Sequence, residues 1–294
     1  MQGEAEEGCL TPVALYVHQR PHYFAQVLEA LSHVEGIGRV CALIVSLDSV
    51  NTEMIDLALA IDFAPVRLIF HPVREDLVPM APVVAIKKHW IWLQDQVWTQ
   101  VAETKAHKGH VALLEEDHIV TRDYLTVLTR LVRMQEQHCP ACWGVTVRWG
   151  CMHDNDADVR KVCRSHSVIN TGIAFSRDTY DAIKASDFEQ FADGWDWALF
   201  HLAQTGQIGG RDMMLGPAVS RISNIGREGA TVSPDAADPH VLKQLNYNNV
   251  GNQSVAVDEL YLHVPDGAVE GDRQYTPPCW EPLYLGSVGF ISQV

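Results

Sequence analysis

Apolar residues follow two spacings along the first part of the chain, and each spacing predicts a different element. Short runs rich in β-branched residues predict strands, and apolar positions three or four residues apart predict helices. The expected strands are 12–17, 40–48, 66–70 and 110–114, and the expected helices are 23–34, 52–61 (capped by Thr52) and 83–104. Strands that alternate with helices of this length indicate parallel βαβ units, which bind ligands beyond the carboxyl ends of their strands.

The second half has a more mixed pattern. It predicts helices at 122–137, 177–185 and 194–205, strands at 143–150 and 168–176, and a polar loop at 152–161. From about Asn224 to Ala256 the chain is rich in Gly, Asn, Pro and Ser, which predicts loops with one short helix at 240–245. A single α/β body followed by a loop-rich region is therefore expected.

Composition and charge narrow the class of protein. The chain has 294 residues, of which 47% are hydrophobic, and its formal net charge is -15. This charge disfavours nucleic acid or an anionic membrane surface as the main partner, because both would be repelled at long range. We expect no membrane segment, because every apolar run falls short of the roughly 20 residues that span a bilayer.

The first residues, MQGEAEEGCLTP, are acidic and lack the features of a secretory signal. If Met1 is the native start, a cytoplasmic protein is expected. Five of the seven cysteines are dispersed in a way that favours reduced thiols. Cys139 and Cys142 have CxxC spacing, which is compatible with a local disulfide or with two unpaired thiols. A zinc site is disfavoured, because neither a second CxxC nor a histidine pair lies nearby.

The strand expected at 110–114 runs into three carboxylates, Glu115, Glu116 and Asp117. Successive strand residues face opposite sides, so Glu115 and Asp117 should point one way and Glu116 the other. Hard divalent cations prefer oxygen ligands, and such a cation can neutralise a nucleotide diphosphate. A metal-diphosphate site is one interpretation of this stretch. A solvated acidic turn is the other.

Several stretches, taken in order, resemble the N-acetylglucosaminyltransferases of N-glycan processing. The likeness is greatest to the N-acetylglucosaminyltransferase II (α-1,6-mannosyl-glycoprotein 2-β-N-acetylglucosaminyltransferase) family and weaker to N-acetylglucosaminyltransferase I. It rests on YVHQRPHYFAQVLEAL, IVSLDSVNTEM, KKHWIWLQDQVW, LLEEDHIVTRDYL, QEQHCPACW, NTGIAFSRDTY and GWDWALFHL, which cover roughly 12–205. The resemblance implies an α/β fold of the GT-A type with a mostly parallel central sheet flanked by helices. It also implies a UDP-GlcNAc donor, inversion at C1 of the sugar, and a divalent cation, usually Mn²⁺, with Mg²⁺ as an alternative.

The resemblance also assigns roles to individual residues. Asp117 corresponds to the metal ligand, and Asp196 in GWDW corresponds to the catalytic base. The remaining residues that it places around the nucleotide sugar are Glu115 and Glu116 in the pocket, Asp48 at the uracil edge, His18 and Arg20 in the wall of the uridine pocket, and His89 near the nucleotide.

Physical chemistry supports part of this assignment and leaves alternatives open. An inverting transfer is a single displacement, which needs one base and a stabilised leaving group. Asp196 lies between Trp195 and Trp197, an apolar setting in which a carboxylate is a better base and indole rings can grip a sugar. Alternatively, Asp196 caps a helix that carries two core tryptophans.

The other assignments have alternatives of the same kind. Asp48 follows a strand, so it is also placed to cap the next helix. His89 belongs to a tryptophan-rich helix, where a structural histidine is equally compatible. For Arg20, the alternative is a salt bridge at the surface.

The chain departs from the family pattern in two places. N-acetylglucosaminyltransferase II has a histidine after its later RI dipeptide, whereas Asn224 follows RIS here, so the metal would depend mainly on Asp117, diphosphate and water. The stretch GREGATVS resembles the phosphate-covering loop of N-acetylglucosaminyltransferase I, which would place Arg227 and Ser233 over the diphosphate; an ordinary loop is the alternative. In addition, only HPVREDLVPMAPVVAI stands where the family has a long acceptor-binding insertion, so the acceptor does not carry over.

Together these observations predict an inverting, metal-dependent glycosyltransferase that moves a sugar, GlcNAc above all, from UDP to a hydroxyl of a glycan or small molecule. The expected organisation is an acidic tail at 1–10, a catalytic domain at 11–265 with a nucleotide-binding half (11–118) and an acceptor-side half (119–265), and a tail at 266–294. A nucleotidyltransferase is one alternative, although HQRPHY lacks the glycines of its usual loop. A nucleotide-sugar or glycan binding protein without turnover is another. If the chain is trimmed from a longer protein, the Golgi lumen replaces the cytoplasm.

Overall fold

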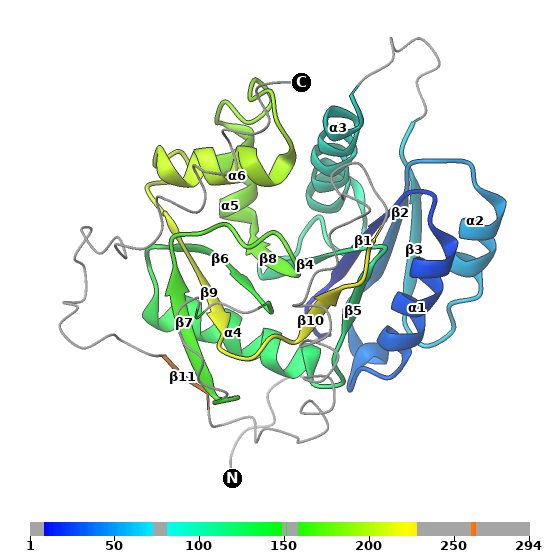
Figure 1. Ribbon diagram of the computed structural model, residues 1–294, viewed down its shortest axis with the longest axis horizontal. Coiled ribbons are helices and arrows are strands. Elements are labelled where there is room, and N and C mark those ends of the chain that lie inside the picture. The colour runs from blue at the N-terminus through cyan, green and yellow to red at the C-terminus, as the bar shows by residue number, and fades with distance from the viewer. Residues whose placement is uncertain (1–8, 73–80, 149–150, 152–157, 228–259, 263–294) are drawn as a thin grey trace. The chain divides into compact units, whose positions relative to one another are not determined.

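A computed structural model describes residues 9–72, 81–148, 151, 158–227 and 260–262, which all belong to one structural unit, Met1–Leu262. Its centre is a nine-stranded sheet with the order β11-β7-β9-β6-β8-β4-β1-β2-β3 (Figure 1). The strands are β1 (Val13–Val17), β2 (Leu43–Leu47), β3 (Val66–Phe70), β4 (His110–Glu115), β6 (Cys142–Thr146), β7 (Lys161–Ser165), β8 (Ile173–Ser176), β9 (Met213–Pro217) and β11 (Tyr261–Leu262). A separate antiparallel pair joins β5 (His118–Val120) to β10 (Ile222–Asn224).

Most neighbouring strands of the sheet are parallel. The pairs β1–β2, β2–β3, β1–β4, β6–β9 and β7–β11 are parallel, and β8 runs antiparallel to both β4 and β6. The remaining pair, β7–β9, is antiparallel. The expected mostly parallel sheet is therefore confirmed.

Helices cover both faces of this sheet. They are α1 (Pro21–Ser32), α2 (Thr52–Leu59), α3 (Pro82–Asp95), α4 (Tyr124–His138), α5 (Arg177–Lys184) and α6 (Trp195–Gln204), with short turns of other helix types at Ile37–Arg39 and Gln96–Gln100. The side chains of β1 alternate between two cores. Val13 and Leu15 pack with α1, α2 and α4, whereas Ala14 and Tyr16 pack with α3, α5 and α6. Burial on both faces explains the continuous apolar runs of these strands.

The helix boundaries correct two expectations. Thr52 is the first residue of α2 and not its cap, because the side chain of Asn51 accepts the Met54 N–H at 3.2 Å. The long helix expected at 83–104 begins at Pro82 and leaves α-geometry after Asp95, where a π-helical turn takes over.

The strands of the second half also differ from expectation. The strand expected at 143–150 ends at Thr146, and the one expected at 168–176 begins only at Ile173. β7 starts at the end of the segment expected to be a polar loop, and β9, β10 and β11 were missed. The short helix expected at 240–245 lies outside the described residues, as do most of the loops expected up to Ala256.

Six cysteines form three disulfides, which contradicts the expectation of dispersed reduced thiols. The pairs are Cys9–Cys41, Cys139–Cys142 and Cys151–Cys163. Two of them join segments that are distant in sequence, and the spacing alone did not reveal these partners because tertiary structure brings them together. The CxxC pair is a local disulfide, one of the two alternatives that the sequence left open.

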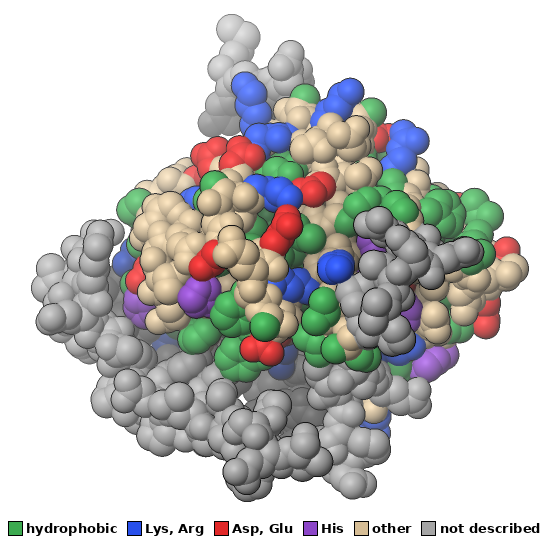
Figure 2. Space-filling view, turned by 90° about the horizontal axis from the view of Figure 1, so that it is seen from above, with side chains coloured by type: hydrophobic (Ala, Val, Ile, Leu, Met, Phe, Trp, Pro, Cys, Tyr) green, Lys and Arg blue, Asp and Glu red, His purple; other side chains and the backbone are tan. Residues whose placement is uncertain are grey.

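The surface is mixed in charge. Figure 2 shows acidic and basic side chains interspersed with hydrophobic ones on the face seen from above, so opposite charges lie near one another there. Among the described residues, every helix is too short or too polar to cross a bilayer.

The disulfides make a testable prediction. Replacing Cys151 and Cys163 by Ala should lower the free energy of unfolding by about 3 kcal/mol, because the bond closes a loop of 12 residues in the unfolded chain. The same change at Cys139 and Cys142, which are also buried but only three residues apart, should cost about 1.5 kcal/mol. Urea unfolding measures both values.

Peptide mapping without reductant provides the control for that comparison. It should recover all three linked pairs from the purified protein. Free thiols at these six positions, or equal losses in the two double variants, would contradict the assignment.

Candidate functional site

Three parallel strands end side by side and bring the acidic residues of the sequence to one edge of the sheet. In the register of the sheet, Val17 of β1 lies opposite Leu47 of β2, and Tyr16 lies opposite Glu115 of β4. The residues that follow these strands therefore lie together at their carboxyl ends, where open α/β sheets bind ligands.

Asp48, which follows β2, is held between two histidines. The Nδ1 atom of His18 forms a short contact with Oδ1 of Asp48, and Nδ1 of His89 lies 3.4 Å from Oδ2. The ring of His89 is buried and its Nε2 is 2.7 Å from the Ser46 hydroxyl. Burial by itself would raise the pKa of Asp48, but the hydrogen bonds from the two histidines outweigh it and lower the pKa. Asp48 is thus an ionised, partly exposed acceptor, and the cap of α2 is Asn51 instead.

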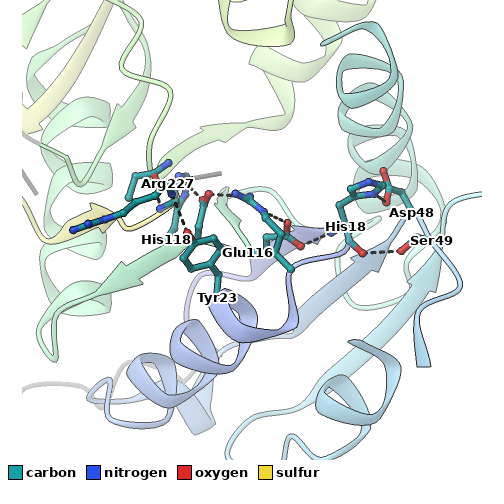
Figure 3. A network of polar contacts seen from close by, with 11 residues as sticks. His18, Tyr23, Asp48, Ser49, Glu116, His118 and Arg227 are labelled. Atoms are coloured by element: carbon teal, nitrogen blue, oxygen red, sulfur yellow. Dashed lines mark hydrogen bonds and ion pairs between the residues drawn. The ribbon is translucent and has the colours of Figure 1, made fainter. Parts of the chain in front are cut away.

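Arg20 joins two carboxylates of the EED stretch, which is Glu115, Glu116 and Asp117. Its Nε donates to Oε1 of Glu116, and its Nη2 lies 2.8 Å from Oδ2 of Asp117. Glu116 also accepts the backbone N–H of His18 at 2.6 Å (Figure 3). The expected alternation of the three carboxylates stops at Glu115, because β4 ends there and a turn carries the next two residues. Both carboxylates of the turn therefore reach the same guanidinium.

Glu115, Asp117 and His118 form a group whose potential ligand atoms all lie within 4.8 Å of one another. The Oδ1 atom of Asp117 is buried and has no hydrogen-bond partner among the described residues. His118 accepts the Glu115 backbone N–H at Nδ1 (3.1 Å), and burial lowers the pKa of its imidazole to about 3. The neutral ring then carries its proton on Nε2, which faces the two carboxylates at 3.8 and 3.9 Å. The carboxylate oxygens, and not the imidazole, therefore offer lone pairs, a set that suits a hard divalent cation.

A glycine allows the chain to pass directly over Asp117. A Cβ atom on Gly226 would lie 2.2 Å from Oδ2 of Asp117 and 3.1 Å from Oδ1 of Asn224. Asn224 pairs with His118 across β5–β10, and its side chain accepts the Gly226 N–H at 2.8 Å. Asn224 therefore lies beside Asp117, but its oxygen already accepts a backbone hydrogen bond.

The pKa of the Glu115 carboxyl is raised by burial and by the negative charges of neighbouring carboxylates. Burial, followed by the negative charges of Asp117 and Asp196, raises the pKa of the Glu115 carboxyl to about 8. Burial and then Glu115 raise the pKa of the Tyr16 phenol well above its usual value, and the charges of Asp117 and Asp196 act on this phenol too. Asp117 and Asp196 are thus near enough to act on the same two groups.

Asp196 lies in the first turn of α6, and the ring of its neighbour Trp195 packs edge-on against Tyr16 of β1 at 6.4 Å between centroids, so α6 begins beside the carboxyl end of that strand. A Cβ atom on Gly194, the residue before the helix, would come within 2.8 Å of Oδ1 of Asp196. The ring of Trp195 is buried and stacks on Trp90 at 5.2 Å between centroids, so it belongs to the core. The neighbouring Trp197 is 37% exposed. Only one of the two indoles beside Asp196 is therefore open to a ligand.

The expected phosphate loop is described only in part. Arg227 is exposed, and its backbone N–H donates to the Tyr23 hydroxyl at 3.0 Å (Figure 3). The guanidinium of Arg20 in turn lies over the Tyr23 ring, 5.3 Å from its centroid. Arg227 therefore lies near the EED turn, while Ser233 lies outside the described residues.

Sequence reasoning missed several residues that shape this site, among them Tyr16, His118, Gly226 and Asn170, whose Nδ2 donates to Oδ2 of Asp196 at 3.0 Å. The sequence did point to His118, because a histidine directly after three carboxylates is placed to interact with them. Tyr16, near the end of β1, looked like an ordinary apolar strand residue. The positions of Asn170 and Gly226 follow only from tertiary structure.

Comparison with known proteins identifies a matching family model and several relatives. A family model described as N-acetylglucosaminyltransferase II (MGAT2) matches residues 8–82 and 78–261. The alpha-1,6-mannosyl-glycoprotein 2-beta-N-acetylglucosaminyltransferase of Arabidopsis thaliana is 28% identical over an alignment of 225 residues, and the match covers 63% of this chain and 52% of the relative. The Rattus norvegicus protein of the same name is 26% identical over an alignment of 239 residues, and the match covers 65% of this chain and 53% of the relative. The chain thus spans about half the length of these curated relatives.

Among solved structures, S. aureus TarS 1-349 in complex with UDP-GlcNAc aligns with a TM-score of 0.45 and 10% sequence identity. The alignment covers 85% of this chain and 68% of that one. A TM-score this low supports neither a shared fold nor a shared function.

The raised pKa of Glu115 makes a testable prediction. In metal-free protein, ¹³C NMR of the side-chain carboxyl should show Glu115 titrating near pH 8, so that it is mostly protonated at pH 7. Asp196→Asn removes a negative charge and should lower this midpoint. Asp193→Asn, the same change at an exposed position three residues earlier, should leave it unchanged. A midpoint near 4.5 would contradict the burial of Glu115 beside Asp117, and equal behaviour of the two variants would show that Asp196 does not act on Glu115.

Proposed function

Because the chain belongs to the N-acetylglucosaminyltransferase II family, we propose that it transfers GlcNAc from UDP-GlcNAc to an acceptor hydroxyl with inversion at C1. The proposed reaction uses a divalent cation, Mn²⁺ or Mg²⁺. The observation that carries the proposal is the gathering of Asp48, Asp117 and Asp196 at one rim of the sheet. Contacts through His18, Glu116 and Arg20 link the first two. Trp195, next to Asp196, packs edge-on against Tyr16 at 6.4 Å between ring centroids, and Tyr16 lies opposite Glu115 in the sheet.

In the proposed reaction, Asp196 takes the proton of the acceptor hydroxyl. Its carboxylate lies in the first turn of a helix and is partly buried. As the oxygen of the acceptor attacks C1 of the sugar, the bond from C1 to the diphosphate breaks and its electron pair leaves with UDP. One base and one stabilised leaving group are sufficient for this single displacement.

The leaving diphosphate needs positive charge. Arg20 already bridges Glu116 and Asp117, and Arg227 lies nearby on the segment that follows β10. Asp117 is the proposed ligand of the divalent cation, because its buried Oδ1 lacks a hydrogen-bond partner among the described residues. When bound, such a cation would neutralise the negative charge that develops on the diphosphate.

Asp48 is the proposed reader of the uracil. Hydrogen bonds from His18 and His89 keep its carboxylate ionised, and an ionised carboxylate accepts the N3–H of a uracil ring. The exposed ring of His18 (57% of its side-chain surface) and the guanidinium of Arg20 would then form the wall beside the uridine. The contacts of Asp48 with two histidines support this role over the alternative of a helix cap, because Asn51 caps α2.

The acceptor is proposed only as a class, a hydroxyl of a glycan or of a small molecule. Trp197, exposed beside the base, offers an aromatic face for a sugar ring. A second candidate function, nucleotide-sugar binding without turnover, draws support from Asn224. Its side chain is occupied by Gly226 N–H, so it adds little to the cation site.

We also propose an oxidising compartment, such as the lumen of the secretory pathway, in place of the expected cytoplasm. Three disulfides within the described residues support this, because thiols in the cytosol are kept reduced. The peptide mapping described above, applied to protein from its own cells after thiol blocking, tests the compartment. If all six cysteines carry the blocking reagent, the proposal of an oxidising compartment is refuted.

The base assignment predicts a separation of binding from chemistry. Asp196→Asn should bind UDP within about two-fold of the unmodified protein, as measured by calorimetry with Mn²⁺. Its turnover, measured as UDP released from UDP-GlcNAc with a mannose-terminated glycan as acceptor, should fall by roughly 100-fold or more because the proton acceptor is lost.

Asp193→Asn is the matched control, because it removes the same charge from an exposed position outside the site. It should retain full turnover. Unchanged turnover in Asp196→Asn would remove the base assignment. An unmodified protein that binds UDP-GlcNAc but gives no product with any acceptor would favour the binding function.

A further inference from the structure

Asn170 lies in the segment between β7 and β8, and it contacts Asp196. Its Nδ2 donates to Oδ2 of Asp196 at 3.0 Å, and the residue is half-buried. The other carboxylate oxygen, Oδ1, accepts the backbone N–H of Trp197 at 3.0 Å. With both oxygens held, the carboxylate cannot rotate about its Cβ–Cγ bond without losing a hydrogen bond. Its orientation therefore depends on Asn170.

A hydrogen-bonded chain continues from Asn170 to a permanent cation. The Thr171 hydroxyl donates to Oδ1 of Asn170 at 3.3 Å, and Nη1 of Arg148 donates to that hydroxyl at 2.8 Å. Thr171 is 2% exposed, so water does not readily replace these partners.

The chemistry of the ends fixes the direction of every bond in this chain. A guanidinium only donates, so the Thr171 oxygen accepts from Arg148 and its proton is free to donate to Asn170. The oxygen of the Asn170 amide must then face Thr171, which leaves its NH₂ group toward Asp196. An ionised carboxylate only accepts, so this is the one amide orientation that satisfies both neighbours.

The backbone around this chain is held independently of the Thr171 hydroxyl. The Thr146 hydroxyl donates to the backbone oxygen of Thr171 at 2.9 Å. Gly172 adopts a φ of +62°, and a Cβ there would lie 2.7 Å from Val147. The turn should therefore keep its shape when the Thr171 hydroxyl alone is removed.

From this geometry we propose that Asn170 and Thr171 are positioning residues: the chain Arg148–Thr171–Asn170 orients the Asp196 carboxylate toward the acceptor hydroxyl. The inference rests on the proposed role of Asp196 as the base. It deepens that role, because it explains why an asparagine and a threonine in the stretch NTG lie beside GWDW. Asn170 acts through the Asp196 carboxylate, and Thr171 acts through Asn170.

The test compares two substitutions at one position. Thr171→Val keeps the shape of the side chain but has no hydroxyl, so the Asn170 amide loses its fixed direction. It should lower kcat about ten-fold and leave the KM for UDP-GlcNAc within two-fold. Thr171→Ser retains the hydroxyl and should restore kcat to within about two-fold of the unmodified protein. Urea unfolding verifies that both variants fold.

A second readout is independent of turnover. In ¹⁵N-labelled protein, the side-chain NH₂ signals of Asn170, assigned by their loss in Asn170→Asp, should move in Thr171→Val and stay in place in Thr171→Ser. If Val and Ser give the same NH₂ signals, the proposed chain is wrong. Equal kcat values in active enzyme would refute its role in orienting Asp196.

The two readouts also separate this inference from the proposed function. If the unmodified protein gives no product, the transferase proposal fails and the orienting role fails with it. The NH₂ signals then still decide whether the hydrogen-bonded chain exists.

Discussion

The crowding of carboxylates at one end of the sheet is the constraint on which the site depends. Glu116 and Asp117 are almost fully buried, and Glu115 lies beside them. Like charges in a poorly solvated setting repel strongly unless cations or protons offset them. In this chain Arg20 supplies one positive charge to two of the carboxylates, and burial favours a proton on the third. The rim is thus built to receive additional positive charge.

The surrounding fold makes this crowding possible. The strands β1, β2 and β4 are buried on both faces, so the positions of their carboxyl ends are fixed by two large cores. Gly226 lets the backbone pass over Asp117, and Gly194 leaves space for Asp196. A histidine pair keeps Asp48 ionised at the other end of the rim. Each carboxylate therefore has a distinct environment, which is compatible with the distinct roles proposed for it.

Local pattern was sufficient for the first half of the fold and insufficient for much of the second. The strands around Leu15 and Leu113 are continuous apolar runs, and helices such as α1 have a clear periodic face, so local sequence identified them. β7 and β9 were missed because runs such as KVCRS and MMLGP become strands only through pairing with distant partners. The disulfides joining Cys9 to Cys41 and Cys151 to Cys163 were not predicted for the same reason, because tertiary structure brings their partners together.

The candidate site divides in the same way. Asp48, Glu115 and Asp117 follow strands whose ends must meet in a parallel sheet, so their proximity could be predicted. The contacts of Arg20 with two carboxylates and of Asn170 with Asp196 link segments about 100 and 26 residues apart, and sequence spacing does not encode them. The roles given to His89 and Arg227 came from family resemblance, and the structure adds the contacts that place them near Asp48 and Tyr23.

A crystal structure of the protein with Mn²⁺ and UDP would show whether these carboxylates bind a cation and a nucleotide together. We expect an anomalous peak within about 2.0–2.6 Å of a carboxylate oxygen of Asp117, with the uracil edge against Asp48 and the diphosphate between the ion and Arg20. UDP bound elsewhere, or an ion held by residues away from the end of β4, would contradict it.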